Sequence, residues 1–467
     1  MTSARTTSPP SAAIPVVPGR GWLGNTVEFM RSPLGFFIDA YHSYGPVFRM
    51  DVPMTRQAVV VAGSLADDLL RGDPGDGAER RRDGLFRPFS AEVGVDVFEL
   101  EGDIHRDLRE LLRQPYARSI VAPFAAEIAA VVGDEVDATY AGEAVDLFAL
   151  TARLSLHAAM AVVTPMSLRN AAPDIQRAGA AVMYAAFRLR PFATLRRPRY
   201  RRARRAMQAA IDEAIARHQR GDFRERGRTW MIDACVAATN QAGMRMDLRA
   251  IRGACFYALA GTEIYIGRLI GFLLFELLRD RSALRRVLAE LATTDADAPL
   301  AEVLAAAPFL RAAYTETLRC YPLIPAYPYT AIVDQRIGGY AIPAGQLLLF
   351  APHIGHFVDD HYANPMTFDA ARHLPPRREP AARRLFAAFG VGPHACSAQG
   401  FVEALSLAIV VALLRRADLE LVRPSYRMEL RMTPLLAPRR PIELRVRGRR
   451  AQEEHVQKDM YTSAEGV

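Results

Sequence analysis

Apolar residues of this chain recur mainly at the spacing of an α-helix. From about residue 63 to residue 320 they return every three or four positions, as in IHRDLRELLRQPYA, FAAEIAAVVGDEVDATY and DLFALTARLSLHAAMAVV, which predicts amphipathic helices. The longest segment of this kind runs from about Leu248 to Leu278 and is apolar on most faces, as expected for a helix through the centre of a domain. Another apolar helix is predicted from about Ser397 to Arg415.

Extended structure is predicted near both ends of the chain. The segments GPVFRM and QAVVVAG (Gln57–Gly63) are rich in β-branched residues and lie between turn residues, which indicates a short hairpin. Ile337–Pro352 has a similar pattern, broken by glycine and proline. A loop-rich stretch from about Asp359 to Pro393 follows, and a few strands are expected after the last helix. The pattern therefore predicts a mainly α-helical fold with small β-sheets.

Both termini have a polar composition. Residues 1–20 are rich in proline, serine and threonine and are predicted to form a disordered tail, while residues 451–467 are predicted to form a flexible one. The N-terminal residues contain no apolar run of the length that a signal peptide or membrane anchor needs. The most apolar stretch, Ile264–Leu278, is interrupted by Arg268 and Glu276 and is shorter than the roughly 20 residues of a membrane span. We expect a cytoplasmic protein without a membrane anchor.

The chain is basic, with a net charge of +8, and all but one of its 59 basic residues are arginine. Such a balance fits a nucleic acid, an anionic membrane surface or an acidic protein as partner. No helix-turn-helix, zinc-finger or RNA-binding motif is present, so no nucleic acid is expected. The arginine run from Arg188 to Arg205 leaves three alternatives open: a solvated face, a site for an anionic substrate or carrier, and contact with a membrane surface.

The four cysteines, Cys235, Cys255, Cys320 and Cys396, have no CxxC spacing, so neither a zinc site nor a disulfide framework is indicated. Cys396 lies in FAAFGVGPHACSAQG, just before a predicted helix. There the helix dipole and free backbone N–H groups favour a thiolate.

Three alternatives follow for this cysteine. A nucleophile would need a general base, for which His394 is a candidate. A metal ligand would need a metal that accepts one protein ligand, as haem iron does. The third alternative is an inert core cysteine. Gly390 and Gly392 allow a tight loop around the sulfur, and Phe389 can shield it from water.

The segment FGVGPHAC resembles the cysteine-ligand loop of the cytochrome P-450 superfamily, in its soluble bacterial form. Other segments resemble the same family in the same order. ETLR (Glu316–Arg319) is similar to its Glu-x-x-Arg helix motif, FDAARH supplies Arg372, and IHRDLR supplies His105 and Arg109. GGYAIPAG and HFVDDHYANPMTF resemble the segments between these motifs. The similarity spans about residues 15 to 445.

The resemblance implies one haem domain over residues 21–450, with small β-sheets and the long helix crossing the haem. It implies haem b as cofactor, with Cys396 as the axial thiolate ligand to the iron. It also implies that Phe389, His394, His105 and Arg109 take part in haem binding, and that Glu316, Arg319 and Arg372 form structural ion pairs.

In the long helix, AGTE falls where the family carries small residues followed by an acid. By resemblance, Ala260 and Gly261 leave room for a diatomic ligand, and Glu263 supplies protons. The alternative is a solvated or salt-bridged Glu263 on the other face of the helix.

Three positions depart from the family pattern. Ile264 replaces a threonine whose hydroxyl guides the protonation of dioxygen, and isoleucine cannot donate. Thr262 lies about 200° further back around the helix and should point elsewhere, while Tyr265 is placed to reach the pocket edge. Tyr329 replaces an arginine that contacts a haem propionate. Ala398 replaces a glycine, which costs little in a first helical turn.

We interpret the chain as a monooxygenase-like enzyme of specialised metabolism. Alternatives are a lyase or isomerase, an enzyme that uses peroxide or N–O bonds, and a haem protein without turnover. The expected substrate is a largely apolar small molecule, and the expected electron donor is a separate ferredoxin or flavodoxin near Arg106 and Arg113. We expect a monomer. The predicted pocket residues are Phe89, Val97, Phe98, Phe256, Tyr257, Ile264, Tyr265, Ile324, Tyr327, Leu435 and Leu436.

Overall fold

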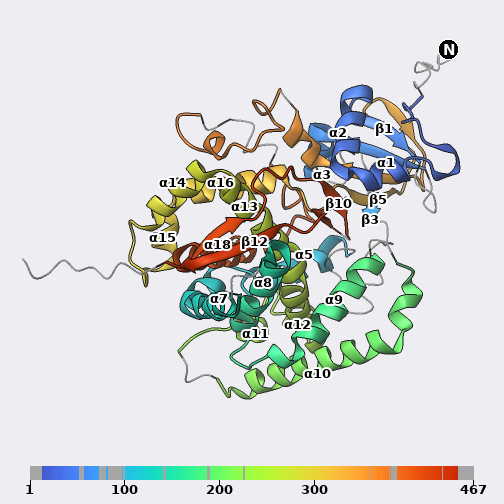
Figure 1. Cartoon of the computed structure of the whole chain (residues 1–467). Coiled ribbons are helices and arrows are strands. Elements are labelled where there is room, and N and C mark those ends of the chain that lie inside the picture. Colours follow the sequence, from blue (N-terminus) through green and yellow to red (C-terminus); the bar gives the residue numbers. More distant parts are fainter. Residues whose placement is uncertain are drawn as a thin grey trace, which may run out of the picture.

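The computed structural model describes residues 13–51, 57–72, 80–82, 97, 100–139, 144–186, 190–223, 227–358, 360–377, 379, 386–433 and 435–450. Helices dominate this part of the chain (Figure 1). The α-helices are α1 (Thr26–Arg31), α2 (Pro33–Tyr44), α3 (Gly63–Arg71), α5 (Gly102–Arg113), α6 (Arg118–Val121), α7 (Ala125–Thr139), α8 (Leu147–Val163), α9 (Ala172–Ala186), α10 (Pro198–Arg220), α11 (Met231–Ala237), α12 (Leu248–Phe256), α13 (Gly267–Arg279), α14 (Arg281–Leu291), α15 (Leu300–Ala306), α16 (Pro308–Cys320) and α18 (Gln399–Arg416).

Shorter helical turns join these helices. The 3-10 turns are η1 (Gly21–Leu23), η2 (Ala122–Phe124), η3 (Arg169–Ala171), η4 (Phe192–Arg196), η7 (Pro352–Phe357) and η8 (Ala370–His373), and η6 (Tyr257–Ile266) is a π-helix.

The strands form four small sheets. The strands are β1 (Val47–Met50), β2 (Ala58–Ala62), β3 (Arg80–Arg82), β4 (Val145–Asp146), β5 (Tyr327–Ala331), β6 (Gln335–Ile337), β7 (Tyr340–Ile342), β8 (Leu347–Ala351), β9 (Ala417–Leu421), β10 (Leu430–Met432), β11 (Leu436–Pro438) and β12 (Glu443–Arg449). The largest sheet has the order β1-β2-β8-β5-β3, a second has the order β4-β12-β9, and β6-β7 and β10-β11 are hairpins. The prediction of a mainly α-helical fold with small sheets is confirmed.

The five-stranded sheet contains the predicted N-terminal hairpin. β1 and β2 pair antiparallel, with Val47 opposite Val61, and β2 then pairs parallel with β8. β2 is fully buried, which explains its unbroken run of apolar residues. The sheet also contains β3, an all-arginine strand that pairs with β5 and that the sequence pattern did not predict. Figure 1 shows this sheet with α1 to α3 at one end of the molecule.

The chain before α1 pairs with β1. The Val17 N–H donates to the Arg49 carbonyl at 2.9 Å, the Arg49 N–H donates to the Pro15 carbonyl at 2.8 Å, and Ile14 is buried. The disordered tail predicted for residues 1–20 therefore does not extend over this stretch, because its backbone completes the edge of the sheet. Residues 1–12 and 451–467 lie outside the described residues.

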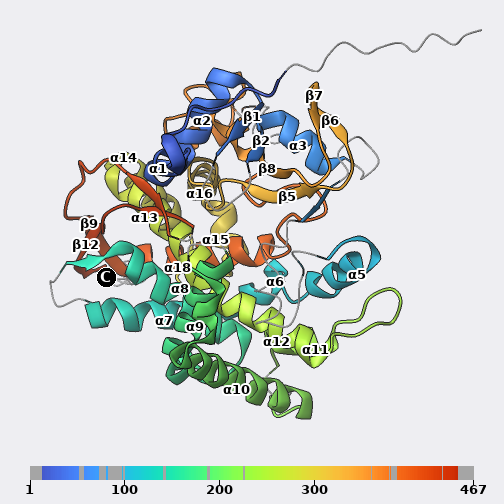
Figure 2. The ribbon, with the colours of Figure 1, turned by 90° about the vertical axis from the view of Figure 1, so that its right-hand side faces the viewer.

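The predicted central helix runs without interruption from α12 through η6 to α13. It begins where the Asp247 side chain accepts from the Ala250 N–H at 2.7 Å, a helix N-cap. It ends at Arg279, because Asp280 caps the next helix. It lies in the middle of the helical part in both views (Figures 1 and 2). Leu248–Arg279 is long and apolar enough to span a membrane, but 78% of its most apolar stretch is buried inside the structure, as expected for a core helix.

The centre of this helix is widened into a π-helix, which the sequence pattern did not predict. The Thr262 hydroxyl donates to the Ala258 carbonyl, four residues back. It thereby competes with backbone N–H groups for that acceptor. At the end of the segment, the Gly267 N–H reaches the Thr262 carbonyl, five residues back. Such π-segments are often found at functional sites.

Helix α8 packs closely along this segment and α13. A Cβ atom at Gly267 would lie 2.7 Å from the Ala152 Cα, and one at Gly271 would lie 2.8 Å from the Phe148 ring. Both distances are too short for a side chain, so the two glycines permit the approach of the helices. The contact fixes the position of the residues of η6.

Candidate active site

Cys396 lies at the end of a tight loop, three residues before α18 begins at Gln399. Gly390 and Gly392 in this loop both have φ of 72°, a conformation that favours glycine. A Cβ atom at Gly392 would also lie 1.8 Å from the Leu70 carbonyl oxygen. The Cys396 N–H donates to the Phe389 carbonyl at 2.8 Å. The two glycines and this hydrogen bond fold the loop back on itself and fix the cysteine.

The Cys396 side chain is accessible, yet burial raises the pKa of its thiol. The backbone N–H of Ala398 and the charge of Arg109 act in the opposite direction and lower the thiol pKa. Both groups stabilise a thiolate, and so would a metal cation bound to the sulfur. This environment fits a metal ligand.

Helix α5 brings two predicted residues to this loop. Arg109 donates from Nη1 to the Ala395 carbonyl at 2.5 Å and to the Ser397 hydroxyl at 3.2 Å. His105 is buried one turn earlier, and its ring lies 4.3 Å from the His394 ring. His105 and Arg109 thus share a face of α5, as their spacing predicts, and both lie against the cysteine loop.

His394 has a further contact that sequence reasoning missed. Its Nε2 lies 3.0 Å from a carboxylate oxygen of Glu101, at the start of α5. No sequence motif contains both residues, because Glu101 and His394 lie 293 positions apart in the chain. The contact leaves His394 3.0 Å from a carboxylate. The structure shows no hydrogen bond between His394 and the Cys396 sulfur.

Glu316, Arg319 and Arg372 form a buried cluster. Arg319 donates to the two Glu316 oxygens at 2.8 and 2.7 Å, and Arg372 donates to one of them at 2.9 Å. All three side chains are almost completely buried. His373, which sequence reasoning missed, lies 2.9 Å from the second Glu316 oxygen. Burial alone would raise the pKa of Glu316, but the hydrogen bonds from Arg319 and His373 outweigh burial and hold that pKa well below its usual range.

This cluster links α16 to the segment before the cysteine loop. Arg319 also donates to the carbonyls of His356 and Pro365, at 2.8 and 2.7 Å. The His356 Nε2 in turn accepts from the Ala387 N–H at 2.9 Å, nine residues before Cys396. The ion pairs therefore help to hold the chain that leads into the cysteine loop.

The small residues of η6 have different surroundings. The Ala260 Cβ would lie 2.7 Å from a Cβ built at Gly179, so Ala260 packs directly against α9. A Cβ at Gly261 would meet only Tyr265, at 4.0 Å, so open space lies beside Gly261. The Thr262 hydroxyl is bonded within its own helix, and Ser155 of α8 donates to its carbonyl at 3.2 Å. The Thr262 hydroxyl therefore does not take the place of the threonine hydroxyl that the family pattern has at position 264.

Glu263 and Ile264 line a cavity of 260 Å³. Its other lining residues come from β4, from α8, from the long helix and from the segment that contains β10 and β11: Asp146, Phe148, Ala152, Arg268, Arg431, Thr433, Ala437, Pro438, Arg440 and Pro441. The Glu263 Oε2 atom is buried and has no hydrogen-bond partner among the described residues. Glu263 is partly buried, so this oxygen is shielded from solvent without a hydrogen-bond donor among the described residues.

The environment of Glu263 tunes its acidity. Burial raises the pKa of Glu263 from 4.5 to about 7, while the nearby charge of Arg268 lowers it. Burial also lowers the pKa of Arg268 to about 10. A carboxyl group with a pKa near 7 can take up and release protons near neutral pH.

Arg268 also fixes the turn between β10 and β11. Its guanidinium donates to the Thr433 carbonyl and, at 3.4 Å, to the Leu436 carbonyl. The Leu436 N–H donates to the Leu323 carbonyl at 3.1 Å. This places the fully buried Leu435 and Leu436 between the long helix and the segment that contains Ile324. The predicted pocket residues Leu435, Leu436 and Ile324 are thereby brought together.

Two predicted pocket tyrosines lie near the cysteine. Burial raises the pKa of Tyr265, and the nearby Cys396 and Tyr327 raise it further. A Cβ at Gly390 would lie 3.4 Å from the Tyr327 hydroxyl. Tyr265 and Tyr327 therefore border the region of the cysteine loop.

The other predicted pocket residues have less informative positions. Phe256 is buried and packs edge-on against the partly buried Tyr257, with ring centroids 6.1 Å apart. Val97 is partly buried, and Phe89 and Phe98 lie outside the described residues.

Tyr329, which stands where the family pattern has an arginine, points into the core of the five-stranded sheet. It is buried, and its ring packs edge-on against Phe350, with centroids 5.3 Å apart. This side chain supplies no charge to the site.

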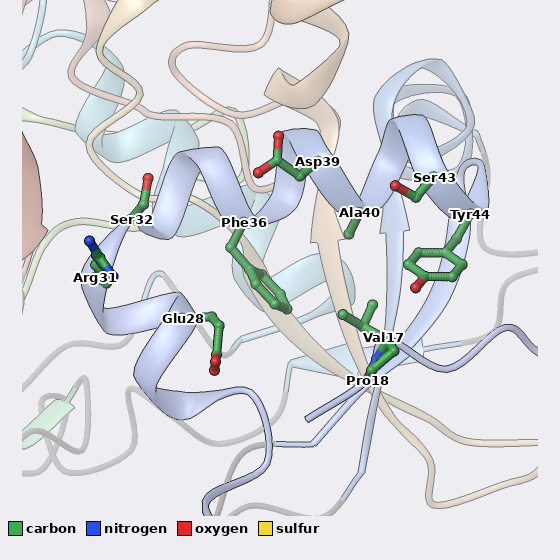
Figure 3. Close-up of a pocket in the computed structure, with 10 residues that line it drawn as sticks. All are labelled: Val17, Pro18, Glu28, Arg31, Ser32, Phe36, Asp39, Ala40, Ser43 and Tyr44. Atoms are coloured by element: carbon green, nitrogen blue, oxygen red, sulfur yellow. The ribbon is translucent and has the colours of Figure 1, made fainter. Parts of the chain in front are cut away.

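A second cavity of 380 Å³ lies between the N-terminal segment and helices α1 and α2 (Figure 3). Val17 and Pro18 form one side, and Phe36 and Tyr44 of α2 form the other. None of its lining residues belongs to the predicted site.

The comparisons with known proteins agree with this geometry. The model of the family described as "Cytochrome P450" matches residues 15–446. A sterol 14α-demethylase of Mycolicibacterium vanbaalenii is 29% identical over 226 residues, which are 47% of this chain and 50% of that protein. The chain thus spans about half the length of that relative. Cyclooctat-9-en-7-ol 5-monooxygenase of Streptomyces melanosporofaciens is 23% identical over 410 residues, 84% of this chain and 86% of that one.

Solved structures show the same fold. The structure of retinoic acid bound cyanobacterial CYP120A1 matches with a TM-score of 0.76 and 18% identity, and the match covers 94% of this chain and 99% of that one.

Proposed function

The chain belongs to the cytochrome P450 family and is a haem-thiolate oxidoreductase, and from this premise we propose that it carries out a monooxygenase-like oxidation of a largely apolar small molecule in specialised metabolism. The observation that carries the proposal is the setting of Cys396. Cys396 is exposed, its loop is fixed by Gly390 and Gly392, and the charge of Arg109 lowers the pKa of its thiol.

The residues around Cys396 fit a haem held by one thiolate. Cys396 would bind the iron, Phe389 would cover the sulfur, and His105, Arg109 and His394 would contribute from the same side. Bound haem would supply the redox-active iron at which oxidation takes place. Arg109 also braces the loop through the Ala395 carbonyl.

Glu263 is proposed to supply protons, with Gly261 leaving open space nearby, while the predicted role of Ala260 in leaving such space is not supported because its side chain packs against α9. Its pKa of about 7 and its unpartnered Oε2 suit a group that takes a proton from the cavity and passes it on. Arg268 holds that pKa down, because its charge favours the carboxylate.

The substrate is proposed to be mostly apolar. Ile264, Leu435 and Leu436 would provide an apolar surface, and Tyr265 and Tyr327 would add hydroxyl groups for orientation. The relatives named above act on a sterol and on cyclooctat-9-en-7-ol, which supports an apolar substrate class. The proposal gives this chain no particular compound.

Electrons are proposed to come from a separate ferredoxin or flavodoxin. On α5, the side chains of Arg106 and Arg113 are exposed, and the same helix contacts the cysteine loop through Arg109. An acidic donor docked there would lie close to the thiolate side of the haem.

The alternative is a lyase, an isomerase or an enzyme that uses peroxide or N–O bonds. Ile264 favours this alternative, because it offers no hydroxyl where the family pattern has threonine, and the Thr262 hydroxyl is engaged elsewhere. Glu263 favours the oxygenase, because a proton donor with a pKa near 7 has little use where no protons are delivered.

Turnover conditions separate the two proposals. The purified holoprotein is incubated with a ferredoxin, its reductase, NADPH and a compound that shifts its absorption spectrum. The oxygenase proposal predicts substrate-dependent oxygen uptake and a product that carries one atom from isotopically labelled dioxygen. Product formation under anaerobic conditions without reductant would contradict the proposal and support the alternative.

A further inference from the structure

The cavity of 260 Å³ that contains Glu263 is rich in arginine. Three arginines from separate parts of the chain line it: Arg268 of α13, Arg431 of β10 and Arg440, which follows β11. Arg431 and Arg440 are exposed, and neither side chain makes an ion pair within the part of the chain that the structure describes. The cavity therefore reaches the surface beside two unpaired cations of the described region.

The acidic side chains of the cavity do not balance this positive charge. Its lining contains two acids, Asp146 and Glu263. Asp146 is already engaged, because its side chain accepts from the Phe148 N–H at 2.8 Å and caps α8. Burial raises the pKa of Glu263 to about 7, so this group is only partly ionised near neutral pH. The three arginines thus face one full and one partial negative charge.

Two of these arginines lie close enough to repel each other. Burial lowers the pKa of Arg268, and the positive charge of Arg431 lowers it further. Arg268 donates to the Thr433 and Leu436 carbonyls, but a guanidinium has several N–H donors, so it can bind a ligand as well. An anion between Arg268 and Arg431 would replace this repulsion by attraction to both.

The rest of the lining is mostly apolar. Its apolar members come from α8, from the long helix and from the segment that contains β11: Phe148, Ala152, Ile264, Ala437, Pro438 and Pro441. An inorganic anion gains nothing from such a surface, whereas an organic acid can place its apolar part there. A guanidinium also binds a carboxylate through two parallel hydrogen bonds. The cavity therefore fits a carboxylate that carries an apolar group.

We propose that this cavity holds the carboxylate of the substrate between Arg268 and Arg431, with the apolar part of the substrate against Ile264. The inference rests on the proposed function and narrows its substrate class to apolar carboxylic acids. Arg440 adds positive charge at the surface of the cavity, which attracts the acid as it enters.

Glu263 links binding of the acid to protonation. Its Oε2 atom is buried and has no hydrogen-bond partner among the described residues. A bound carboxylate favours the neutral form of Glu263, because two adjacent carboxylates repel each other, and the neutral group can donate a hydrogen bond to the anion. Binding thus takes up a proton from water and leaves the proposed proton donor protonated.

Calorimetric titration of the resting holoprotein tests the proposal. The probes are benzoate, its neutral analogue benzamide and inorganic phosphate, at pH 8. We expect saturable binding of benzoate, and binding of benzamide and phosphate that is weaker by about ten-fold or more. Absence of saturable benzoate binding, or equal binding of benzamide, would overturn the proposal. Tighter binding of phosphate would assign the cavity to a free inorganic anion and also overturn it.

Arg431→Gln is the test variant, because the Arg431 side chain is exposed and its loss should leave the melting temperature unchanged. We expect it to bind benzoate about ten-fold more weakly than the wild type. Arg445→Gln is the matched control: Arg445 is exposed on β12 and does not line the cavity. It loses the same charge and should bind benzoate like the wild type. Equal affinities in the two variants would contradict the assignment of the site.

Proton uptake gives a second measurement. Titrations in two buffers of different ionisation enthalpy report the protons that binding takes up, and we expect a net uptake for the wild type at pH 8. Glu263→Gln should still bind benzoate but without this uptake. No uptake in the wild type, or uptake that persists in Glu263→Gln, would overturn the role of Glu263. These titrations need neither reductant nor turnover, so their failure is distinct from a failure of the proposed oxidation.

Discussion

Glu263 and Arg268 lie in or next to the π-helical segment and line the same cavity of 260 Å³. Each alters the acidity of the other: Arg268 lowers the pKa of Glu263, and Glu263 raises the pKa of Arg268, against the larger effect of burial on each. Arg268 also ties the long helix to the turn that carries Leu435. Arg268 therefore acts on the proposed proton donor through its charge and on the wall of the proposed substrate pocket through its hydrogen bonds.

The raised pKa of Glu263 predicts a pH-dependent gain in stability for Glu263→Gln. Between 4.5 and about 7 the folded protein keeps a proton that the unfolded chain has lost, so the wild type loses stability as pH rises through this range. We expect the variant to be more stable than the wild type by about 3 kcal/mol at pH 8 and equally stable near pH 4. Melting temperatures at the two pH values measure this, and equal melting temperatures at pH 8 would contradict it.

Removal of the Arg268 charge is expected to raise the pKa of Glu263 above 7. The physical reason is that the positive charge of Arg268 favours the carboxylate. Infrared difference spectroscopy of the protonated carboxyl band as a function of pH measures the midpoint of the Glu263 titration directly in Arg268→Gln. Arg268→Lys keeps the charge and should shift the midpoint less, and Arg445→Gln should not shift it. A midpoint that stays near 7 in Arg268→Gln would show that burial alone sets the value.

A hydroxyl at position 264 is expected to improve the coupling of reductant to product. Ile264 lines the cavity next to Glu263 and has no donor, so Ile264→Thr adds one beside the proton source. We expect the fraction of NADPH recovered as product to rise several-fold. Ile264→Val changes the size of the side chain without adding a donor and should leave this fraction unchanged. If Thr and Val behave alike, the hydroxyl has no role in this enzyme.

Glu316→Gln is expected to destabilise the protein strongly. The change leaves Arg319 and Arg372 buried with less opposite charge, and loss of one partner from a buried pair costs about 3–5 kcal/mol. Glu379→Gln is a matched control, because Glu379 pairs with Arg372 from a partly exposed position and should cost less. Thermal unfolding compares the two, and a similar small loss in both would contradict a structural role for the buried cluster.

Local patterns in the sequence predicted much of the fold. The apolar run predicted the long helix, the β-branched run at Gln57–Gly63 predicted β2, and ETLR placed Glu316 and Arg319 on one face of a helix. These features depend on residues close together in sequence. The motif resemblance located the cysteine loop as well, because its glycines and its cysteine are contiguous.

The remaining features depend on contacts between distant segments. Strand β3 forms by pairing with β5, more than 240 residues later, and its arginines give no strand signal. The π-helix has no signature in the apolar pattern. The hydrogen bond from Arg268 to the Thr433 carbonyl joins the long helix to a turn near the C-terminus. The Glu101 contact with His394 is of the same kind. Sequence spacing carries no information on such pairs.

Carbon monoxide binding to the reduced protein tests the central claim, that Cys396 holds a haem as thiolate, most directly. The account predicts the red-shifted Soret band typical of thiolate ligation for the wild type and for Cys235→Ser, Cys255→Ser and Cys320→Ser, because these three cysteines are buried or bonded in other parts of the fold. It predicts loss of that band in Cys396→Ser. A wild type without the band, or a Cys396→Ser variant that retains it, would contradict the account.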